Sequence, residues 1–425
     1  MRKRGMVRFP LRRTCFRWAL SLFAFEQLAL KGVAWVAPLS TAVYALYFLL
    51  DMLIPCLLAV CFMADARKRR SPCHVLVLLV CVLLGVSAWI TRENALLYSG
   101  IMILLARNMD MDGMIDSLYR SFGLALCLLL SAFFLRLTVS LPVNFSYGMG
   151  YSFGMAHPNN FGAAATAFLL LWAYRRREKP FLQTVLIMEA VGLIVFRFTL
   201  SRTSWIILLL YPAVYLLLRL PYRVRGEWLI RLTYLEFFAL MGASVALMLY
   251  SERSSVLPVF FGDQNYLARF TSALSLYNKH GVHLFGAYIE YRSLRLALLT
   301  GKEAVILDSA YLYLLIGQGI SALLVFFILI SRAVSRLIRK RQFALLAILG
   351  LFLASGMMER YMLYCYMNFP LLAVAAALGR EKKTVLFPAL QVRRGLPLGR
   401  RRKTKYNIHD RQWLQSAYAA SNRQG

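Results

Sequence analysis

Apolar segments of similar length alternate with short polar segments along most of the chain. About twelve of them approach the roughly 20 residues that a helix needs to cross the hydrocarbon core of a bilayer. The pattern predicts an all-α, polytopic integral membrane protein with about 12 transmembrane helices, of which the first, fourth and twelfth match it least well. The expected spans are residues 17–37, 41–63, 73–91, 94–107, 121–140, 158–174, 182–200, 203–218, 232–250, 309–330, 342–358 and 364–379.

Lys and Arg gather in every second connection between these spans. The clusters contain 38 of the 50 Lys and Arg residues, and the positive-inside rule assigns them to the cytoplasmic side. An even number of spans then puts both termini in the cytoplasm. This topology accounts for the net charge of +31 without a nucleic-acid site. The clusters are residues 1–17, 64–72, 107–120, 175–180, 219–231, 331–341 and 380–425.

Two segments depart from the regular alternation. Residues 251–308 form one large extracytoplasmic loop of 58 residues with mixed charge. The spacing of Phe270, Leu274 and Leu276 predicts an amphipathic helix in this loop, ended by Lys279 to Gly281. Residues 380–425 form a basic tail, interpreted as disordered and attracted to anionic lipid or, alternatively, as a site for a regulatory partner. The transmembrane domain is therefore residues 1–379.

Several common signatures are missing from the chain. It has no P-loop, no GxGxxG after a strand, no HExxH and no cluster of Asp suited to Mg²⁺. Its seven cysteines have no metal-type spacing and are interpreted as small apolar residues. We therefore expect no cofactor and no metal, and ATP-driven transport and metal-dependent glycosyl transfer are disfavoured.

The first candidate site is the polar start of an apolar helix, His157-Pro158-Asn159-Asn160. Proline suits the first turn of a helix, where its missing N–H is not needed. His157 and Asn159 could bind a sugar or a phosphate, helped by the free backbone N–H groups of the turn. An ordinary helix cap explains the same residues equally well.

The second candidate is Arg202, with Arg197, at the outer hinge between two spans. A guanidinium stays charged and presents a planar fork that matches phosphate oxygens. Arg202 is expected at the membrane surface, where a lipid-linked pyrophosphate would lie. The alternative is that both arginines extend toward lipid headgroups.

The third candidate is Arg269, followed by a segment rich in hydrogen-bond donors that contains His280 and His283 and two glycines. Either histidine could act as a general base near neutral pH. A surface histidine without a role is the alternative.

The fourth candidate is a pair of acids at helix ends. Asp308 precedes an apolar run and suits an N-cap, and Glu359 follows another and is expected to face Arg360. Charged groups near apolar spans are costly and therefore indicate function by default.

At these residues the chain resembles the O-antigen polymerase and ligase superfamily, especially the Wzy-type polysaccharide polymerases of capsule and exopolysaccharide loci. The matching pieces occur in the expected order over residues 150–370, about half the chain, and they are moderately specific as a set. Eleven residues separate Arg269 from Gly281, close to the ten of some polymerases. The pieces are SFGMAHPNNFG from Ser152, TLSRTSW from Thr199, the segment from Arg269 to HLFG at Gly286, LDSAYLYLLIGQG from Leu307, and Glu359 to Pro370.

The resemblance implies a metal-independent glycosyltransferase in the bacterial cytoplasmic membrane that acts on undecaprenyl-pyrophosphate-linked oligosaccharides on the outer face. A hydroxyl of one repeat unit attacks the anomeric carbon of another chain, and the lipid pyrophosphate leaves. Arg202 and Arg269 then become the pyrophosphate clamp. His157, Asn159, Arg197, Asp308 and Glu359 would shape the substrate site, and His280 or His283 would be the base.

Three functions remain open at this point: a polymerase of repeat units, a ligase that moves a finished glycan to another acceptor, and a flippase or transporter. A transporter is expected to have charges in the middle of its spans, whereas most charges here gather at helix ends and in one loop. The distribution favours chemistry at the membrane surface. The expected partners are the lipid-linked oligosaccharide and membrane lipid, with a flippase and a chain-length regulator as further candidates and no nucleic acid.

Overall fold

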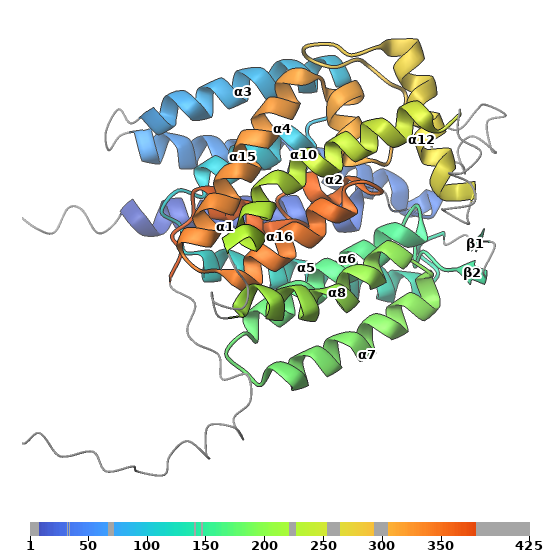
Figure 1. Ribbon diagram of the computed structural model, residues 1–425, viewed down its shortest axis with the longest axis horizontal. Coiled ribbons are helices and arrows are strands. Elements are labelled where there is room, and N and C mark those ends of the chain that lie inside the picture. The colour runs from blue at the N-terminus through green and yellow to red at the C-terminus, as the bar shows by residue number, and fades with distance from the viewer. Residues whose placement is uncertain are drawn as a thin grey trace, which may run out of the picture. The chain divides into compact units, whose positions relative to one another are not determined.

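The computed structural model describes most of the predicted transmembrane domain, and this part is mostly helical (Figure 1). The described residues are 8–31, 33, 35–66, 72–139, 142–145, 148–220, 227–252, 264–292 and 305–379. The basic tail and parts of the predicted outer loop lie outside them.

The N-terminal half consists of helices followed by a small hairpin. These elements are α1 (Arg8–Phe25), the π-helical turn η1 (Glu26–Leu30), α2 (Ala37–Ala66), α3 (Pro72–Thr91), α4 (Ala95–Leu105) and α5 (Met111–Phe134), then the antiparallel strands β1 (Val143–Phe145) and β2 (Gly148–Gly150).

The second half continues with helices and ends in a compact irregular segment. Its elements are α6 (Pro158–Arg175), α7 (Phe181–Thr199), α8 (Arg202–Arg219), α10 (Glu227–Tyr250), α12 (Gln264–His280), α14 (Ala310–Leu312), the π-helical turn η2 (Tyr313–Gln318), α15 (Ile320–Arg339), α16 (Phe343–Ser355) and the 3₁₀ turns η3 (Arg360–Leu363) and η4 (Phe369–Val374).

Seven helices of the described part are long and apolar enough to cross a membrane. They are Leu39–Ala64, His74–Thr91, Met111–Phe134, Phe181–Thr199, Arg202–Arg219, Leu232–Tyr250 and Ile320–Arg339. Each is close to the roughly 20 residues that the hydrocarbon core requires. The chain is thus a helical protein with several candidate membrane spans, in agreement with the apolar pattern of its sequence.

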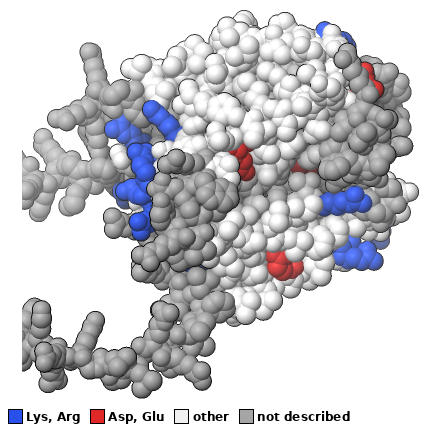
Figure 2. All heavy atoms as spheres, in the orientation of Figure 1, with Lys and Arg blue, Asp and Glu red and all other residues white. Residues whose placement is uncertain are grey.

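The surface of these helices fits contact with lipid. In the most apolar stretch of α7, only 17% of the residues are buried inside the protein, compared with 50% in α15. Large apolar side chains such as Leu186 and Ile194 are exposed on α7. On the face shown in Figure 2, Lys and Arg gather toward two ends and the surface between them is mostly uncharged. Such a band is expected where hydrocarbon covers a protein.

A largely buried segment is one that the apolar pattern assigned to a twelfth span. Residues 364–379 contain no α-helix. They include the 3₁₀ turn η4, which together with the preceding turn η3 forms a largely buried structure packed against α15 and α16. Pro370 lacks the N–H that a regular helix interior needs. The Arg336 guanidinium donates to the carbonyls of Val374 (2.6 Å) and Ala376 (2.8 Å), so the polar backbone of this turn is satisfied by a side chain.

The expected span 309–330 is interrupted near its middle. The helix breaks at Gly319, whose φ of 89° suits glycine, and α15 starts immediately afterwards. A Cβ at Gly319 would overlap the backbone of Gly286, which also has a positive φ of 83°. Residues 283–291, here called the strap, can therefore lie directly on this break. Backbone hydrogen bonds hold the strap there: the Ile320 N–H donates to the His283 carbonyl (3.1 Å), and the Ala287 N–H donates to the Gly317 carbonyl (3.1 Å).

Candidate functional site

A polar cavity of about 170 Å³ lies where segments far apart in the sequence meet. This volume has room for several water molecules. It is lined by Gln27, Leu28, Lys31, Met155, Asn160, Asp308, Glu359, Arg360, Tyr361, Tyr364, Tyr366 and Met367. The lining comes from the end of η1, the start of α6, the approach to α14 and the segment after α16. Ammonium, guanidinium, carboxylate, amide and phenol groups thus meet in one place.

The start of α6 presents Asn160 to this cavity, and His157 caps the helix. His157 has an extended backbone, and its Nδ1 accepts a hydrogen bond from the Asn159 N–H (3.1 Å), with Pro158 in the first helical position. Burial lowers the pKa of His157, with Asp308 opposing and Arg269 adding to the decrease. A neutral ring fits this role, since Nδ1 must accept. His157 is therefore the N-cap of α6, as one of its two interpretations from the sequence expected.

The central feature of the site is an ion cluster around Arg269. Its Nε lies 3.5 Å from Asp308 Oδ2, its Nη1 lies 3.3 Å from Glu359 Oε1, and Nη1 also donates to the Met358 carbonyl. The expected N-cap role of Asp308 is wrong, because Ser309 occupies that position before α14. Glu359 likewise pairs with Arg269 and not with its neighbour Arg360. Both differences arise because α12 brings Arg269 between the two acids.

Asparagine amides connect this cluster to the start of α6. Asn159 Nδ2 donates to Glu359 Oε1 (3.2 Å), and Tyr361 Oη donates to Asn160 Oδ1 (3.2 Å). The side chains of His157, Asn159, Arg269, Asp308 and Glu359, five of the residues singled out in the sequence, are thereby brought together.

Burial shapes the acid–base properties of the cluster. Glu359 is 6% exposed, and its burial raises the pKa of this carboxyl to about 7, with Arg269 opposing the increase. Burial also raises the pKa of Tyr361 well above its usual value, so this phenol remains a hydrogen-bond donor. A carboxyl with a pKa near neutrality can take up and release a proton under physiological conditions.

Arg360 is a part of the site that the sequence reasoning did not select. Its guanidinium carbon lies 5.1 Å from the centre of the Tyr291 ring and 4.9 Å from that of Tyr313, which are distances of cation–π contacts. The sequence feature that could have identified Arg360 is its position between two apolar segments, in the tyrosine-rich stretch ERYMLYCYM. Lys31, also in the lining, follows an apolar helix in the same way.

The remaining predicted residues lie elsewhere in the described structure. His280 ends α12, and His283 follows it with its ring Nε2 2.6 Å from the His280 carbonyl. Slight burial and the nearby Lys279 lower the pKa of His280. Arg197 is exposed in the last turn of α7, and Arg202 is the first residue of α8. Among the described residues that line the cavity, none of these four occurs.

The segment around Arg202 nevertheless packs beside the site. A Cβ at Gly162 in α6 would collide with Ser201, so glycine allows α6 and the start of α8 to approach closely. Thr166 Oγ1 donates to the Ser204 carbonyl (3.3 Å), and Ser201 Oγ donates to Ser204 Oγ (2.8 Å). The second sequence motif thus supports the helix that carries the first.

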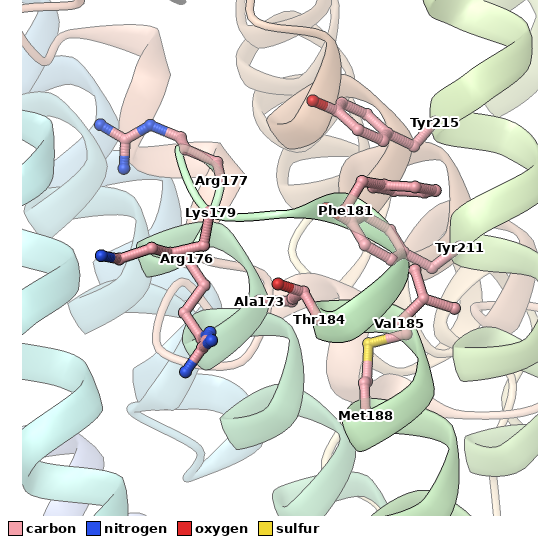
Figure 3. Close-up of a pocket in the computed structure, with 10 residues that line it drawn as sticks. All are labelled: Ala173, Arg176, Arg177, Lys179, Phe181, Thr184, Val185, Met188, Tyr211 and Tyr215. Atoms are coloured by element: carbon pink, nitrogen blue, oxygen red, sulfur yellow. The ribbon is translucent and has the colours of Figure 1, made fainter. Parts of the chain in front are cut away.

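A second cavity lies at the other end of α6, at its turn into α7, and Figure 3 shows its lining. Its volume is about 20 Å³, which is room for about one water molecule. Tyr211, Tyr215 and Phe181 form its apolar side, and Arg177 forms an ion pair with Asp112 (2.8 Å). The cavity near Arg269 is therefore the better candidate for a sugar or a phosphate.

Comparison of the chain with protein-family models, with curated proteins and with solved structures gave no match. In the part of the chain that the structure describes, no three His, Cys, Asp or Glu side chains are grouped as a metal site.

Proposed function

We propose that this protein polymerises lipid-linked oligosaccharide repeat units on the outer face of the bacterial cytoplasmic membrane, for a capsule, an exopolysaccharide or an O-antigen. The reaction is glycosyl transfer from an undecaprenyl-pyrophosphate-linked chain, without a metal. The growing chain is the donor, and a sugar hydroxyl of a second lipid-linked unit is the acceptor.

The observation that supports this proposal best is the convergence of sequence motifs at one polar cavity. The HPNN start of α6, Arg269 of α12, Asp308 and Glu359 contact one another, although up to about 200 residues separate them in the sequence. The resemblance to Wzy-type polymerases rested on these same pieces. Amide, phenol and charged groups are the groups that bind sugar hydroxyls and phosphate.

The chemistry needs a proton acceptor and a stabilised leaving group. The acceptor hydroxyl attacks the anomeric carbon of the donor, the bond between that carbon and the pyrophosphate oxygen breaks, and the lipid pyrophosphate departs with the bonding electrons. The acceptor's proton passes to the Glu359 carboxylate, whose pKa of about 7 suits a general base. We assign this role to Glu359 in preference to His280 and His283, since the histidines do not line the cavity.

The proposal includes the topology expected from the sequence. About 12 spans, both termini in the cytoplasm and a large outer loop at residues 251–308 would put the cavity on the outer side, since the basic end of α6 at Arg175 to Lys179 would then face the cytoplasm. α6 has 18 residues and is thus roughly 27 Å long, which separates the cavity from that basic end by nearly one bilayer core.

The experiment that tests this function is deletion of the gene in its host, followed by separation of surface and lipid-linked glycans by size. Single repeat units alone are the expected result. Full-length polymer accumulating on the lipid carrier would identify a ligase, and repeat units trapped on the cytoplasmic face would identify a transporter. Either outcome refutes the polymerase.

A further inference from the structure

The charge of Arg269 is already balanced by its contacts inside the protein. Asp308 and Glu359 each form an ion pair with it, at 3.5 and 3.3 Å, and the Met358 carbonyl accepts a further bond. A guanidinium that is paired in this way offers little net charge to a pyrophosphate, and releasing it would leave two carboxylates next to an anionic ligand. Arg269 is therefore poorly suited to bind the leaving group directly.

Two other cations line the same cavity with no such partner. Among the described residues, neither Arg360 nor Lys31 forms an ion pair, and both belong to the lining. Arg360 is partly accessible, and Lys31 is exposed. Their charges can therefore act on a ligand that enters the cavity.

Arg360 lies against aromatic rings, and Glu93 and Asp308 act on its charge from beyond ion-pair distance. Tyr291 and Tyr313 lie against its guanidinium at 5.1 and 4.9 Å. Contact with the two rings helps to hold the guanidinium, and the partly accessible Arg360 lines the cavity. This is the arrangement expected for an anion-binding arginine rather than for a structural one.

Both rings are themselves fixed. The Tyr313 hydroxyl donates to Glu93 and accepts from Gln318 Nε2 (2.9 Å). Tyr291 lies at the end of the strap, which is fastened at the break between η2 and α15, and a Cβ at Gly317 would collide with its hydroxyl. The Tyr291 hydroxyl has no hydrogen-bond partner in the described structure, so the ring alone accounts for its contact with Arg360.

We propose that Arg360, together with Lys31, binds the pyrophosphate of the lipid-linked donor, and that Arg269 is a positioning residue that holds Glu359 and Asp308. This assignment rests on the proposed function and replaces the clamp of Arg202 and Arg269 that the resemblance implied. The ligand is a pyrophosphate ester, and it reaches the site in its lipid-linked form.

The test is binding of undecaprenyl pyrophosphate to the purified full-length protein in lipid nanodiscs, with inorganic pyrophosphate and phosphatidylglycerol as comparison ligands. Arg360→Gln is expected to weaken binding of undecaprenyl pyrophosphate by about tenfold to a hundredfold, the range for losing a hydrogen bond to a charged group. Arg332→Gln, the same substitution at an exposed arginine of α15, is the matched control and should bind like the wild type. Equal binding by Arg360→Gln and wild type would overturn the assignment.

Three further variants separate a binding role from a structural one. Tyr291→Phe keeps the ring and should retain the affinity, whereas Tyr291→Leu should weaken it; equal affinities in this pair would count against the ring contact. Arg269→Gln should lower the thermal stability and leave the affinity of the folded fraction within about threefold. Loss of affinity in Arg269→Gln without loss of stability would restore Arg269 as the clamp.

The comparison ligands distinguish the source of the phosphate. Tighter binding of undecaprenyl pyrophosphate than of either comparison ligand is expected, because the cavity should recognise both the pyrophosphate and its lipid. Preference for phosphatidylglycerol would overturn the proposal in favour of a lipid-headgroup site. The gene deletion tests the polymerase independently of these measurements, so a failure of the function and a failure of the Arg360 assignment can be told apart.

Discussion

At the scale of single residues, the site combines two kinds of partly buried cation. Arg269 is neutralised by carboxylates, whereas Arg360 is supported by aromatic rings. A buried ion pair contributes little net stability relative to apolar residues, but removing one partner leaves an uncompensated charge and is costly. The two arginines should therefore respond differently to substitution.

The coupling of Arg269 to Glu359 can be measured with a double-mutant cycle. Arg269→Met alone should lower the free energy of unfolding by about 3–5 kcal/mol, since the buried Glu359 and the partly buried Asp308 lose their partner. Adding Glu359→Gln should recover part of this loss, with a coupling energy of about 1–3 kcal/mol. Thermal or denaturant unfolding in detergent gives the free energies of unfolding of the wild type, of Arg269→Met, of Glu359→Gln and of the double variant. Strict additivity of the two substitutions would contradict the observed ion pair.

The raised pKa of Glu359 leads to a pH dependence of catalysis. If its carboxylate accepts the proton, kcat/KM should rise about tenfold between pH 6 and pH 8, because a group with a pKa of about 7 becomes ionised over this interval. Turnover of a lipid-linked repeat unit by the reconstituted protein provides the measurement. Glu359→Gln should show low activity at every pH, and an unchanged rising profile in this variant would exclude Glu359 as the base.

At the scale of elements, the position of the strap depends on two glycines. Gly286 and Gly319 both have positive φ and lie so close that a Cβ on either would overlap backbone of the other segment. An L-residue would also be strained in this conformation. The strap brings Tyr291 to Arg360, so a local backbone requirement determines the geometry of a distant side chain.

Gly319→Ala should therefore loosen the strap. We expect a loss of about 1–3 kcal/mol of local stability. This loss would be detected as faster amide hydrogen exchange at residues 283–291. Gly242→Ala is the matched control, because a Cβ there has nothing within 4 Å in helix α10. It should leave exchange in the strap unchanged and can stabilise α10 by up to about 1 kcal/mol. Normal protection of the strap in Gly319→Ala would show that the contact is not required.

At the scale of the whole molecule, charge and apolar length together predict the orientation in the membrane. If the basic connections are cytoplasmic, single cysteines placed at residues 68 and 178 should react with a membrane-impermeant thiol reagent only after the membrane is opened. Cysteines at residues 255 and 298 should react in intact cells, in a variant whose native cysteines are replaced. The reverse pattern, or reaction of all four positions on one side, would refute the proposed topology.

The proposed chemistry as a whole requires no divalent metal. Polymer formation by the reconstituted protein should persist in EDTA at the rate seen without it, because Arg360 and Lys31 would neutralise the leaving pyrophosphate. Activity that disappears in EDTA and returns with Mg²⁺ or Mn²⁺ would refute this part of the proposal. A matched measurement with Ca²⁺ would distinguish a catalytic ion from a general effect on anionic lipid.

The sequence by itself determined the helical, apolar character of the chain. Hydropathy and helix length depend on neighbouring residues and on the thickness of a bilayer, so the helices α3, α7, α8 and α10 agree closely with the apolar segments at 73–91, 182–200, 203–218 and 232–250. The same local reasoning selected His157, Asn159, Arg269, Asp308 and Glu359, although it gave Asp308 and Glu359 the wrong contacts.

Only the tertiary structure decided which charges meet. Arg269 pairs with two acids that lie 39 and 90 positions further along the chain, whereas Arg360, which lines the cavity, forms no ion pair within the part of the chain that the structure describes. The irregular fold of residues 364–379 could not be predicted from the sequence either, because the hydropathy of an apolar segment is the same whether the segment crosses a membrane or is buried in a protein core. The charge on a side chain is a property of the sequence, but whether that charge is neutralised depends on packing between distant segments.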